Sequence, residues 1–317
     1  MSDPPPMALR RVDPGRRWRF SELTVLIDPP QNSPPSADAR TVTLLQRARS
    51  AGVASFDIAG ARFPQRAERL ISRAFPSSDE AACVIVGRSL ESLAREHSAA
   101  GEVRRPTDLE SAVQESLDES RRRLGAIPIA VVEWEPEDND PDAKQPPELP
   151  TLTGKDDPDA PIVARRLTAP VTSLPVPEAG PALFAAPFSL LETELIASFE
   201  SGPDRTVPSL IARDPFAQGR LDGTRFEDQA MLHGPSAGPV DLRRLHEEFD
   251  PIVRLGFLTE GHSRTLGQAA LQFVLRWPWV LTAVVPLPSP ERFEELFDYR
   301  LRPPLSDDNL RRVATMK

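Results

Sequence analysis

Four charged residues stand at or just beyond the ends of short apolar segments of this chain. Asp57, Arg88 and Glu133 each close such a segment, and Arg62 follows Asp57 in the next loop. A carboxylate at a strand end can act as a general acid or base, and an arginine can bind a carboxylate or phosphate group. These residue types predict either acid–base chemistry or the binding of a small anionic ligand, with Asp57 the first residue to test.

Other reactive side chains are scarce. The single cysteine, Cys83, lies in the apolar run AACVIV, which predicts a buried, unreactive thiol and rules out an internal disulfide. The four histidines show no metal-ligand spacing, so we expect no metal site. The only lysines are Lys144, Lys155 and Lys317, and the only tyrosine is Tyr299. A mechanism that needs an amine or a phenol has these candidates alone.

Composition narrows the classes of function. The chain has 317 residues, 39% of them hydrophobic and 27% charged, and a formal net charge of −9. This negative charge argues against a general nucleic-acid or anionic-membrane surface, because phosphate binding requires a basic face. No apolar run approaches the roughly 20 residues that span a bilayer, and the N-terminus lacks the apolar core of a signal peptide. We therefore expect a cytoplasmic protein without nucleic-acid or membrane partners.

Strand-like and helix-like segments alternate along much of the chain. Strands are expected at 20–27, 53–58, 81–86, 127–132, 206–212 and 279–286, and helices at 39–51, 65–74, 107–124, 241–255 and 265–277. This alternation predicts a parallel sheet covered by helices, and eight such units closed on themselves make a (β/α)8 TIM barrel of roughly 250 residues. We expect an irregular N-terminal arm over 1–17 and a single α/β barrel domain over 18–317.

The middle of the chain departs from this alternation. Residues 133–159 are rich in Asp, Glu and Pro and show no helical period, and residues 169–181 are Pro-rich where a crossover helix should lie. A parallel crossover normally needs at least about 10–12 residues, which are usually helical. We therefore expect eroded barrel helices around residues 135–180.

Five segments resemble, in the same order, segments of the aldo-keto reductase superfamily. They are FDIAGARF (56–63), ESLDESRRRLGAIPIAVVEWEP (115–136), APFSLLETEL (186–195), IARDPFAQGRLDG (211–223) and TLGQAALQFVLRWPWVLTAVVPLPSPERFEEL (265–296). The resemblance fails mainly at 137–180. It implies a (β/α)8 barrel of aldo-keto reductase type and a divergent member of that family.

The resemblance also implies a set of catalytic positions. Aldo-keto reductases transfer hydride from NADPH to a carbonyl, using a tyrosine acid, a lysine and aspartate that tune the tyrosine, and a histidine that orients the carbonyl. Asp57 matches the aspartate position, while Arg62, Arg88 and Glu133 stand at the tyrosine, lysine and histidine positions. Because a general acid or base contributes ~10²–10⁴-fold to the rate, the resemblance implies that standard reductase activity is absent. Arg88 is the candidate partner of Asp57.

The family's cofactor contacts are changed in the same way. Leu287 stands where the family has a phosphate-loop glycine, and Leu296 stands at an adenine-contacting asparagine. Ser289 begins a predicted helix whose free N–H groups could bind an anion, and Arg292 could assist it. Ser289 and Arg292 are thus the candidate NADP-binding residues.

Three functions remain open at this point. The leading hypothesis is a catalytically degenerate barrel that acts as a binding, scaffold or accessory protein for a small anionic ligand or a protein partner. The second is an NADP(H)-dependent oxidoreductase that acts on a carbonyl or alcohol with a rearranged site. The third is a barrel enzyme with new chemistry built on Asp57, Glu133, Arg62 and Arg88. These four residues would line the mouth of the barrel, either as a ligand site or as a salt-bridged plug.

Overall fold

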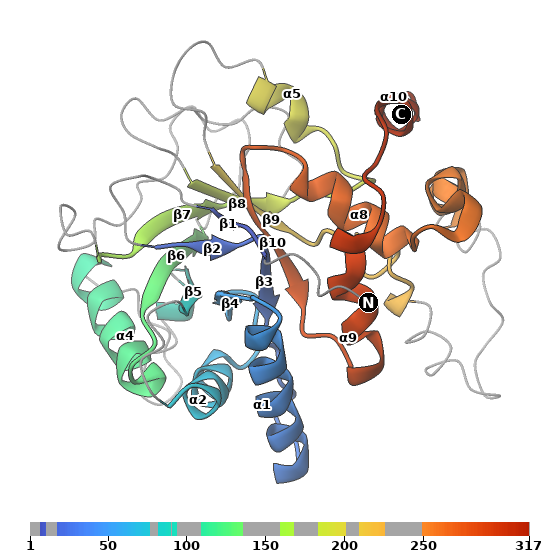
Figure 1. Ribbon diagram of the computed structural model, residues 1–317. Helices are drawn as coiled ribbons and strands as arrows, with labels where there is room; N and C mark the ends of the chain where they lie inside the picture. Colours follow the sequence, from blue (N-terminus) through green and yellow to red (C-terminus); the bar gives the residue numbers. More distant parts are fainter. Residues whose placement is uncertain are drawn as a thin grey trace, which may run out of the picture.

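The chain forms a closed barrel of eight parallel strands (Figure 1). The computed structural model describes residues 7–10, 18–76, 82–89, 91–93, 109–135, 159–167, 183–200, 209–225 and 249–316. Around the barrel the strands follow the order β10-β3-β4-β5-β6-β7-β8-β9. Their bounds are β3 (Leu23–Leu26), β4 (Ser55–Asp57), β5 (Cys83–Ser89), β6 (Ile129–Glu135), β7 (Ile162–Arg166), β8 (Leu183–Pro187), β9 (Ser209–Arg213) and β10 (Val280–Pro286). The predicted (β/α)8 barrel is confirmed.

Alternate residues of each strand face the barrel interior and the helices outside, as the pleat of a strand requires. One buried apolar cluster fills the interior and includes Ile85, Val131 and Ile211. A second, larger cluster lies between the strands and the helices and includes Phe56 and residues of the outer strand faces. This alternation decides which strand residues can enter a site at the mouth.

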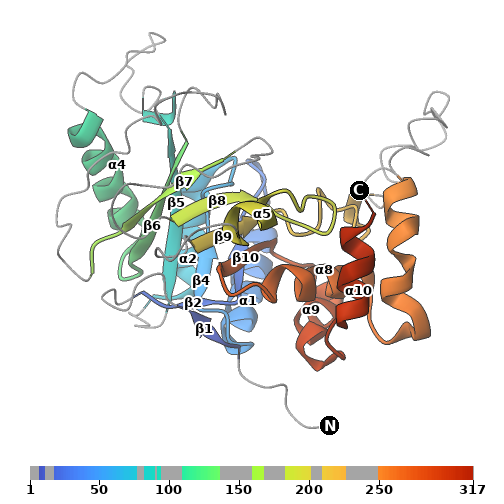
Figure 2. The same cartoon turned by 90° about the horizontal axis from the view of Figure 1, so that it is seen from above.

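Helices cover the outer face of the barrel. α1, α2 and α4 lie along one side, and α8, α9 and α10 lie along another (Figures 1 and 2). The helix bounds are α1 (Pro35–Ser50), α2 (Pro64–Ala74), α4 (Leu109–Leu124), α5 (Leu195–Glu200), α8 (Leu266–Leu275), α9 (Pro290–Phe297) and α10 (Asp307–Ala314), with 3₁₀ segments η1 (Leu255–His262) and η2 (Asp298–Leu301).

Local sequence explains where several helices begin. α2 and α9 start with a proline, whose fixed φ suits the first helical turn. Thr265 caps α8 through a capping box with Gln268, so two backbone N–H groups that the helix leaves open are satisfied. Because these signals lie in the sequence, the predicted starts of these helices agree with the structure.

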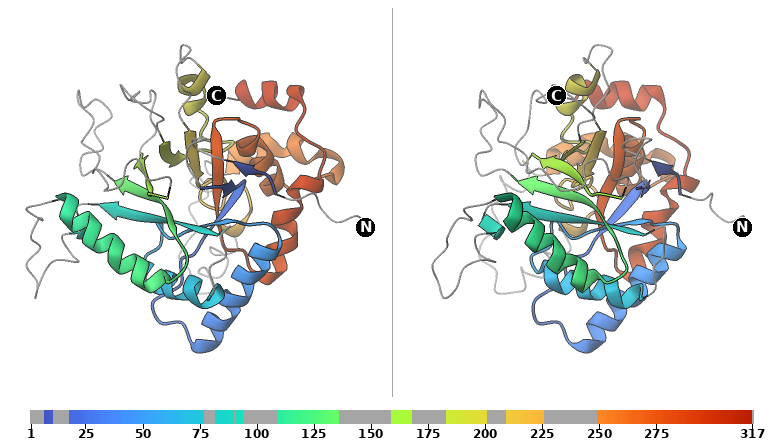
Figure 3. Two further views of the ribbon diagram at one scale, coloured as in Figure 1. Left: turned by 60° about the vertical axis from the view of Figure 1, so that its left-hand side comes forward. Right: turned by 90° about the vertical axis from the view of Figure 1, so that its left-hand side faces the viewer.

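The N-terminal segment contains regular structure. β1 (Leu9–Arg10) pairs with β2 (Phe20–Ser21) in an antiparallel ribbon at the amino end of the barrel (Figure 3). The indole of Trp18 donates a hydrogen bond to the Ala160 carbonyl at 3.1 Å, and the Trp18 and Phe20 rings are buried in the interior cluster. These rings close the amino end of the barrel, which leaves the carboxyl end as the open one.

The expectation of an irregular arm over 1–17 is therefore wrong for Leu9–Arg10, and residues 1–6 and 11–17 lie outside the described ranges. The strand is held by tertiary contacts, since Arg10 donates to the Leu275 carbonyl at 2.9 Å and approaches Glu22 at 3.4 Å. A two-residue strand carries no hydrophobic period, so pattern alone could not reveal it.

Two further expectations concern other parts of the chain. Of the 135–180 region expected to have eroded helices, residues 136–158 and 168–180 lie outside the described ranges. Among the residues that the structure describes, no helix combines the length and apolar character needed to cross a membrane.

Candidate functional site

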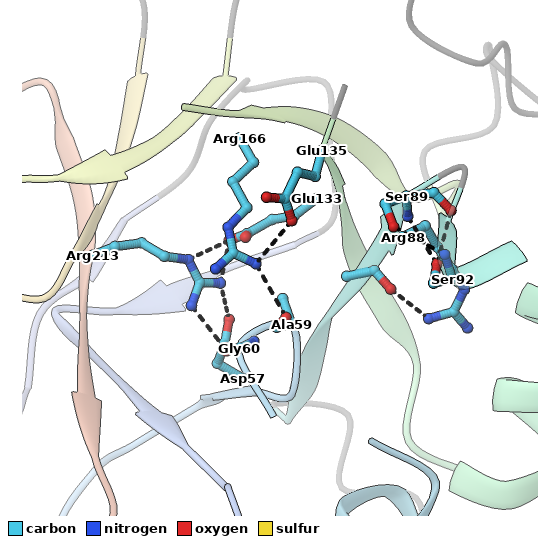
Figure 4. A network of polar contacts seen from close by, with 11 residues as sticks. Asp57, Ala59, Gly60, Arg88, Ser89, Ser92, Glu133, Glu135, Arg166 and Arg213 are labelled. Carbon is cyan, nitrogen blue, oxygen red and sulfur yellow. Dashed lines mark hydrogen bonds and ion pairs between the residues drawn. The ribbon is translucent and has the colours of Figure 1, made fainter. Parts of the chain in front are cut away.

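Three charged side chains form a buried ion-pair cluster at the carboxyl end of the barrel. Arg213, which ends β9, donates from Nη1 to Oδ1 (3.2 Å) and from Nη2 to Oδ2 (2.5 Å) of Asp57, which ends β4. Its Nε donates to Oε1 of Glu133 on β6 at 3.1 Å, and its Nη2 contacts the same oxygen. Figure 4 shows the guanidinium lying between the two carboxylates. We call Asp57, Glu133 and Arg213 the mouth cluster.

Strand register brings the cluster together. Asp57 pairs with Ile85 and Glu133 pairs with Gly87, so both carboxylates stand on strand positions that face inward. Ile211 packs in the interior cluster, and Arg213 follows it by two residues on the same face of β9. The three side chains therefore converge from three strands on one layer of the barrel interior.

Burial governs the electrostatics of the mouth cluster. Both carboxylate residues are 0% exposed, and the Arg213 side chain is 10% exposed. Burial raises the pKa of Glu133, and the Asp57 charge adds to that rise, while Arg213 and Arg166 oppose it. Burial alone would lower the pKa of Arg213, but the two carboxylates outweigh burial and raise that pKa above its ordinary value. One guanidinium is thus shared by two buried carboxyl groups.

A cleft of about 480 Å³ opens above the mouth cluster. Arg213 and Arg166 both line it, and Arg166 ends β7. Arg166 donates from Nη1 to the Ala59 carbonyl at 3.2 Å, and the same nitrogen lies 3.9 Å from Oε2 of Glu135 (Figure 4). The mouth of the barrel therefore presents two guanidinium groups to one cleft.

The turn after β4 connects the mouth cluster to Arg166. The Gly60 N–H donates to Oδ1 of Asp57 at 3.3 Å, so the aspartate caps the end of its own strand. A Cβ on Gly87 would lie 2.8 Å from the Ala59 carbonyl oxygen, which is closer than real Cβ contacts come. Only glycine lets β5 pass beneath this turn. Position 87, which faces inward, accordingly contributes no side chain to the mouth.

Arg88 lies outside the mouth, so its predicted place in the pocket and its predicted pairing with Asp57 are wrong. β5 extends to Ser89, so strand alternation places Arg88 on the face opposite Gly87, and Figure 4 shows its side chain apart from Asp57 and Arg213. Its Nη2 donates to the Ser116 carbonyl at 3.2 Å and to the Ser120 hydroxyl at 2.5 Å, both on α4. The prediction placed the residue beyond the strand end, where its direction is free, whereas within a strand the alternation fixes it.

Arg62 also lies away from the cleft. Its side chain is 69% exposed, and its Nε donates to Oδ2 of Asp28 at 2.9 Å. Its backbone N–H donates to the other oxygen of Asp28, also at 2.9 Å. The predicted pocket position of Arg62 is therefore wrong. Asp28, in the loop after β3, draws the arginine to the rim of the barrel.

Ser289 and Arg292 line a second cleft, of about 220 Å³, beside the start of α9. Arg292 donates to the Asp222 carbonyl at 2.8 Å and lies 3.9 Å from the carboxylate of the same residue. Phe216 and Thr224, from the loop after β9, line both clefts, so the two spaces are neighbours.

Sequence reasoning missed Arg213 and Arg166. Arg213 lies in the segment IARDPFAQGRLDG, whose resemblance to a family pattern does not indicate which face of the strand each residue occupies. Each arginine ends a strand whose side chains alternate between the two faces. Two positions earlier, Ile211 in β9 and Ala164 in β7 pack in the barrel interior. Alternation in these strands was the signal that could have identified them.

Two further observations concern Tyr299 and the residues that could bind a metal ion. Tyr299 is buried near the amino end of the barrel, where its hydroxyl donates to Oε2 of Glu22 at 2.9 Å, and burial together with Glu22 raises its pKa. In the described part of the chain, no three His, Cys, Asp or Glu side chains are grouped so that they could hold a metal ion.

Comparisons with known proteins agree on the fold. No protein-family model matches the sequence, and no curated protein matches it. Among solved structures, a glycerol dehydrogenase from Gluconobacter oxydans superimposes with a TM-score of 0.65 at 16% identity, covering 96% of this chain and 94% of the other. A thermostable aldo-keto reductase in complex with the inhibitor epalrestat gives 0.63 at 15% identity, covering 98% and 100%. The protein is therefore a divergent barrel with the fold of the aldo-keto reductases.

Proposed function

We propose that this protein is a catalytically degenerate barrel that binds a small anionic ligand at its mouth and does not reduce carbonyl compounds by the aldo-keto reductase mechanism. The mouth cluster is the observation that carries the proposal. Arg213 holds both carboxylates at the base of the cleft, with contacts of 2.5 to 3.2 Å to Asp57 and 3.1 Å to Glu133 from Nε. A carboxylate held in this way is not free to tune a separate proton donor.

Under this proposal, the mouth of the barrel does not supply the proton that carbonyl reduction requires. Carbonyl reduction needs an acid within hydrogen-bond reach of the developing alkoxide. The only tyrosine of the chain, Tyr299, lies near the opposite end of the barrel and donates to Glu22. Of the cleft-lining residues, Arg166 and Arg213 carry guanidinium groups, which hold their protons too tightly for this role. The carboxyl groups of Asp214 and Asp222 also line the cleft, but each already accepts a hydrogen bond at 2.7 Å, from the Gln218 N–H and the Thr224 hydroxyl. The two guanidinium groups suit the binding of an anion better than the transfer of a proton.

Turnover measurements test this proposal. Purified protein is mixed with NADPH and a panel of aldehydes and ketones, and absorbance at the cofactor band is followed for the wild type and for Asp57→Asn. We expect no oxidation of NADPH that depends on Asp57. Asp28→Asn is the matched control, because Asp28 also pairs with an arginine but lies at the rim. Turnover that Asp57→Asn abolishes and Asp28→Asn retains would contradict the proposal.

A second candidate, an NADP(H)-dependent oxidoreductase, is favoured by the cleft beside α9. Its lining includes Ser289 and Arg292, whose polar groups fit a nucleotide phosphate. The mouth cluster is less suited to the reactive end of the cofactor. Its two carboxyl groups are bonded to Arg213, and it contains no phenol that could act as the acid. We therefore derive no hydride-transfer step for this chain.

Binding of NADPH separates the two candidates. A ligand that binds only the folded state stabilises it by RT ln(1 + [L]/Kd) and so raises the melting temperature, which means that a thermal shift with NADPH reports binding without turnover. Arg292→Gln should remove the shift if the α9 cleft holds the cofactor. The control is Arg302→Gln, which removes an exposed arginine paired with Asp298 on the same side of the fold.

A further inference from the structure

The cleft above the mouth cluster combines a charged floor with apolar walls. Arg166 and Arg213 supply the positive charge. The apolar walls come from strand ends and from the loops that follow them: Leu26, Leu167, Pro187, Phe216 and Val284. A volume of about 480 Å³ falls in the range of pockets that bury most of a small organic molecule. The cleft is thus built for a ligand with an apolar body.

Arg166 has more binding capacity to offer than Arg213. Three nitrogens of Arg213 donate to the carboxylates of Asp57 and Glu133. Arg166 makes one hydrogen bond among the described residues, to the Ala59 carbonyl, and its nearest carboxylate oxygen, on Glu135, lies at 3.9 Å. That distance is beyond a charge-assisted hydrogen bond, which is about 2.7–2.9 Å long. The remaining N–H groups of Arg166 are therefore available to a ligand.

We propose that the cleft binds an organic monocarboxylate with an apolar body, and that Arg166 pairs with its carboxylate head. This inference rests on the proposed binding function and names the chemistry of the ligand. A guanidinium can donate two parallel N–H hydrogen bonds to a planar carboxylate. A neutral amide has one oxygen and no charge, so it binds the same guanidinium more weakly. The apolar walls then take the remainder of the molecule.

Charges around the cleft favour one negative charge on the ligand rather than two. Asp214 and Asp222 also line the cleft, and Glu135 lies beside Arg166. Asp222 is paired with Arg292, and burial raises the pKa of Asp214, which reduces its tendency to carry charge. A dianion such as a phosphate monoester would meet these carboxyl groups with twice the charge. Like charges at short range cost more as the ligand charge grows.

Matched ligands and matched variants test the proposal. Trans-cinnamate, its neutral amide cinnamamide and the cation phenethylamine are titrated into the protein by calorimetry near neutral pH. The variant is Arg166→Gln. The control is Arg165→Gln, which removes the same charge from the preceding residue of β7. Arg165 pairs with Trp134 and Phe184, two residues of the outer cluster, so its side chain lies on the opposite face of the strand.

The expected result is a preference for the anion that depends on Arg166. Wild type and Arg165→Gln should bind cinnamate at least about tenfold more tightly than cinnamamide, and Arg166→Gln should bring the two Kd values within about twofold. Circular dichroism of each variant confirms that it is folded. The proposal is overturned if cinnamate does not bind at millimolar concentration, if phenethylamine binds more tightly, or if Arg166→Gln keeps the preference. Asp57-dependent turnover would instead refute the proposed function and leave the anion preference standing.

Discussion

Replacement of Arg213 by methionine is the most direct probe of the mouth cluster. Methionine keeps most of the apolar stem of the side chain and removes the guanidinium. The change leaves Asp57 and Glu133, both 0% exposed, without the cation that neutralises them. Two buried carboxyl groups would then face one another across the barrel interior, and at least one must take up a proton or admit water.

The size of the effect follows from burial. Removal of one partner of a buried ion pair costs about 3–5 kcal/mol of unfolding free energy, because the remaining charge stays desolvated. This loss is a large share of the roughly 5–15 kcal/mol that stabilises a typical domain. Without Arg213, which opposes the effect of burial, the folded-state pKa of Glu133 rises further above its unfolded value. The loss should therefore be smaller at acidic pH and grow as pH rises above the ordinary carboxyl range.

Urea unfolding followed by tryptophan fluorescence measures this difference at an acidic and a neutral pH. Arg62→Met is the matched control, since Arg62 also bonds an aspartate, Asp28, at 2.9 Å but is 69% exposed. An exposed pair contributes roughly 0–1 kcal/mol, so the control should change little. If Arg213→Met destabilises the protein no more than Arg62→Met does, the buried cluster is not a stabilising ion pair and the reasoning fails.

Three other predictions address single residues. Glu133→Gln should gain stability relative to wild type as pH rises above 4.5, the ordinary pKa of a glutamate. The reason is that burial raises the pKa of Glu133 in the folded protein, so ionisation of this group costs folding free energy that the glutamine variant does not lose. Urea unfolding at several pH values tests this, and a stability difference that does not change with pH would refute it. Gly87→Ala should cost about 1–3 kcal/mol through overlap with Ala59, whereas Gly256→Ala, with nothing within 4 Å of its Cβ, should cost less; thermal melts compare them. Burial raises the pKa of Cys83 to about 12, so a thiol reagent should label it only after denaturant is added, and labelling of the folded protein would contradict its burial.

Local patterns in the sequence were sufficient to predict most of the barrel. The strand that ends at Asp57, the helix that follows it and the capped helix after Thr265 all stand close to their predicted places. Short apolar runs between helices leave few alternatives to a parallel sheet. The β1–β2 ribbon was not predictable in this way, because contacts of Arg10 with residues more than 260 positions away hold it.

The candidate site was only partly predictable. The resemblance places Asp57 and Glu133 at the family's aspartate and histidine positions, and the structure brings these two residues together. The same resemblance predicts Arg62 and Arg88 at the mouth, but a family pattern gives a position in the sequence and not the direction of a side chain. Arg213, which actually pairs with Asp57, could only be recognised by combining strand register with alternation across β9.

A salt-bridged plug and a ligand site make different demands on the mouth cluster. Buried ion networks can often be replaced by apolar residues of similar volume with no loss, or a gain, of stability. The triple variant Asp57→Leu, Glu133→Met, Arg213→Leu should therefore remain folded. It should nevertheless lose the preference for cinnamate over cinnamamide, because Asp57 holds the Gly60 N–H and so the turn whose Ala59 carbonyl positions Arg166.

The triple variant is measured with the same calorimetric titration, beside an unfolding curve that establishes its stability. A folded triple variant that keeps the wild-type preference would mean that the cluster is a plug with no part in orienting Arg166. A folded variant that loses it would mean that the polar cluster is retained for binding. The contacts favour the second outcome, since Asp57 bonds Arg213 at the base of the cleft and the turn that carries Ala59 at its wall.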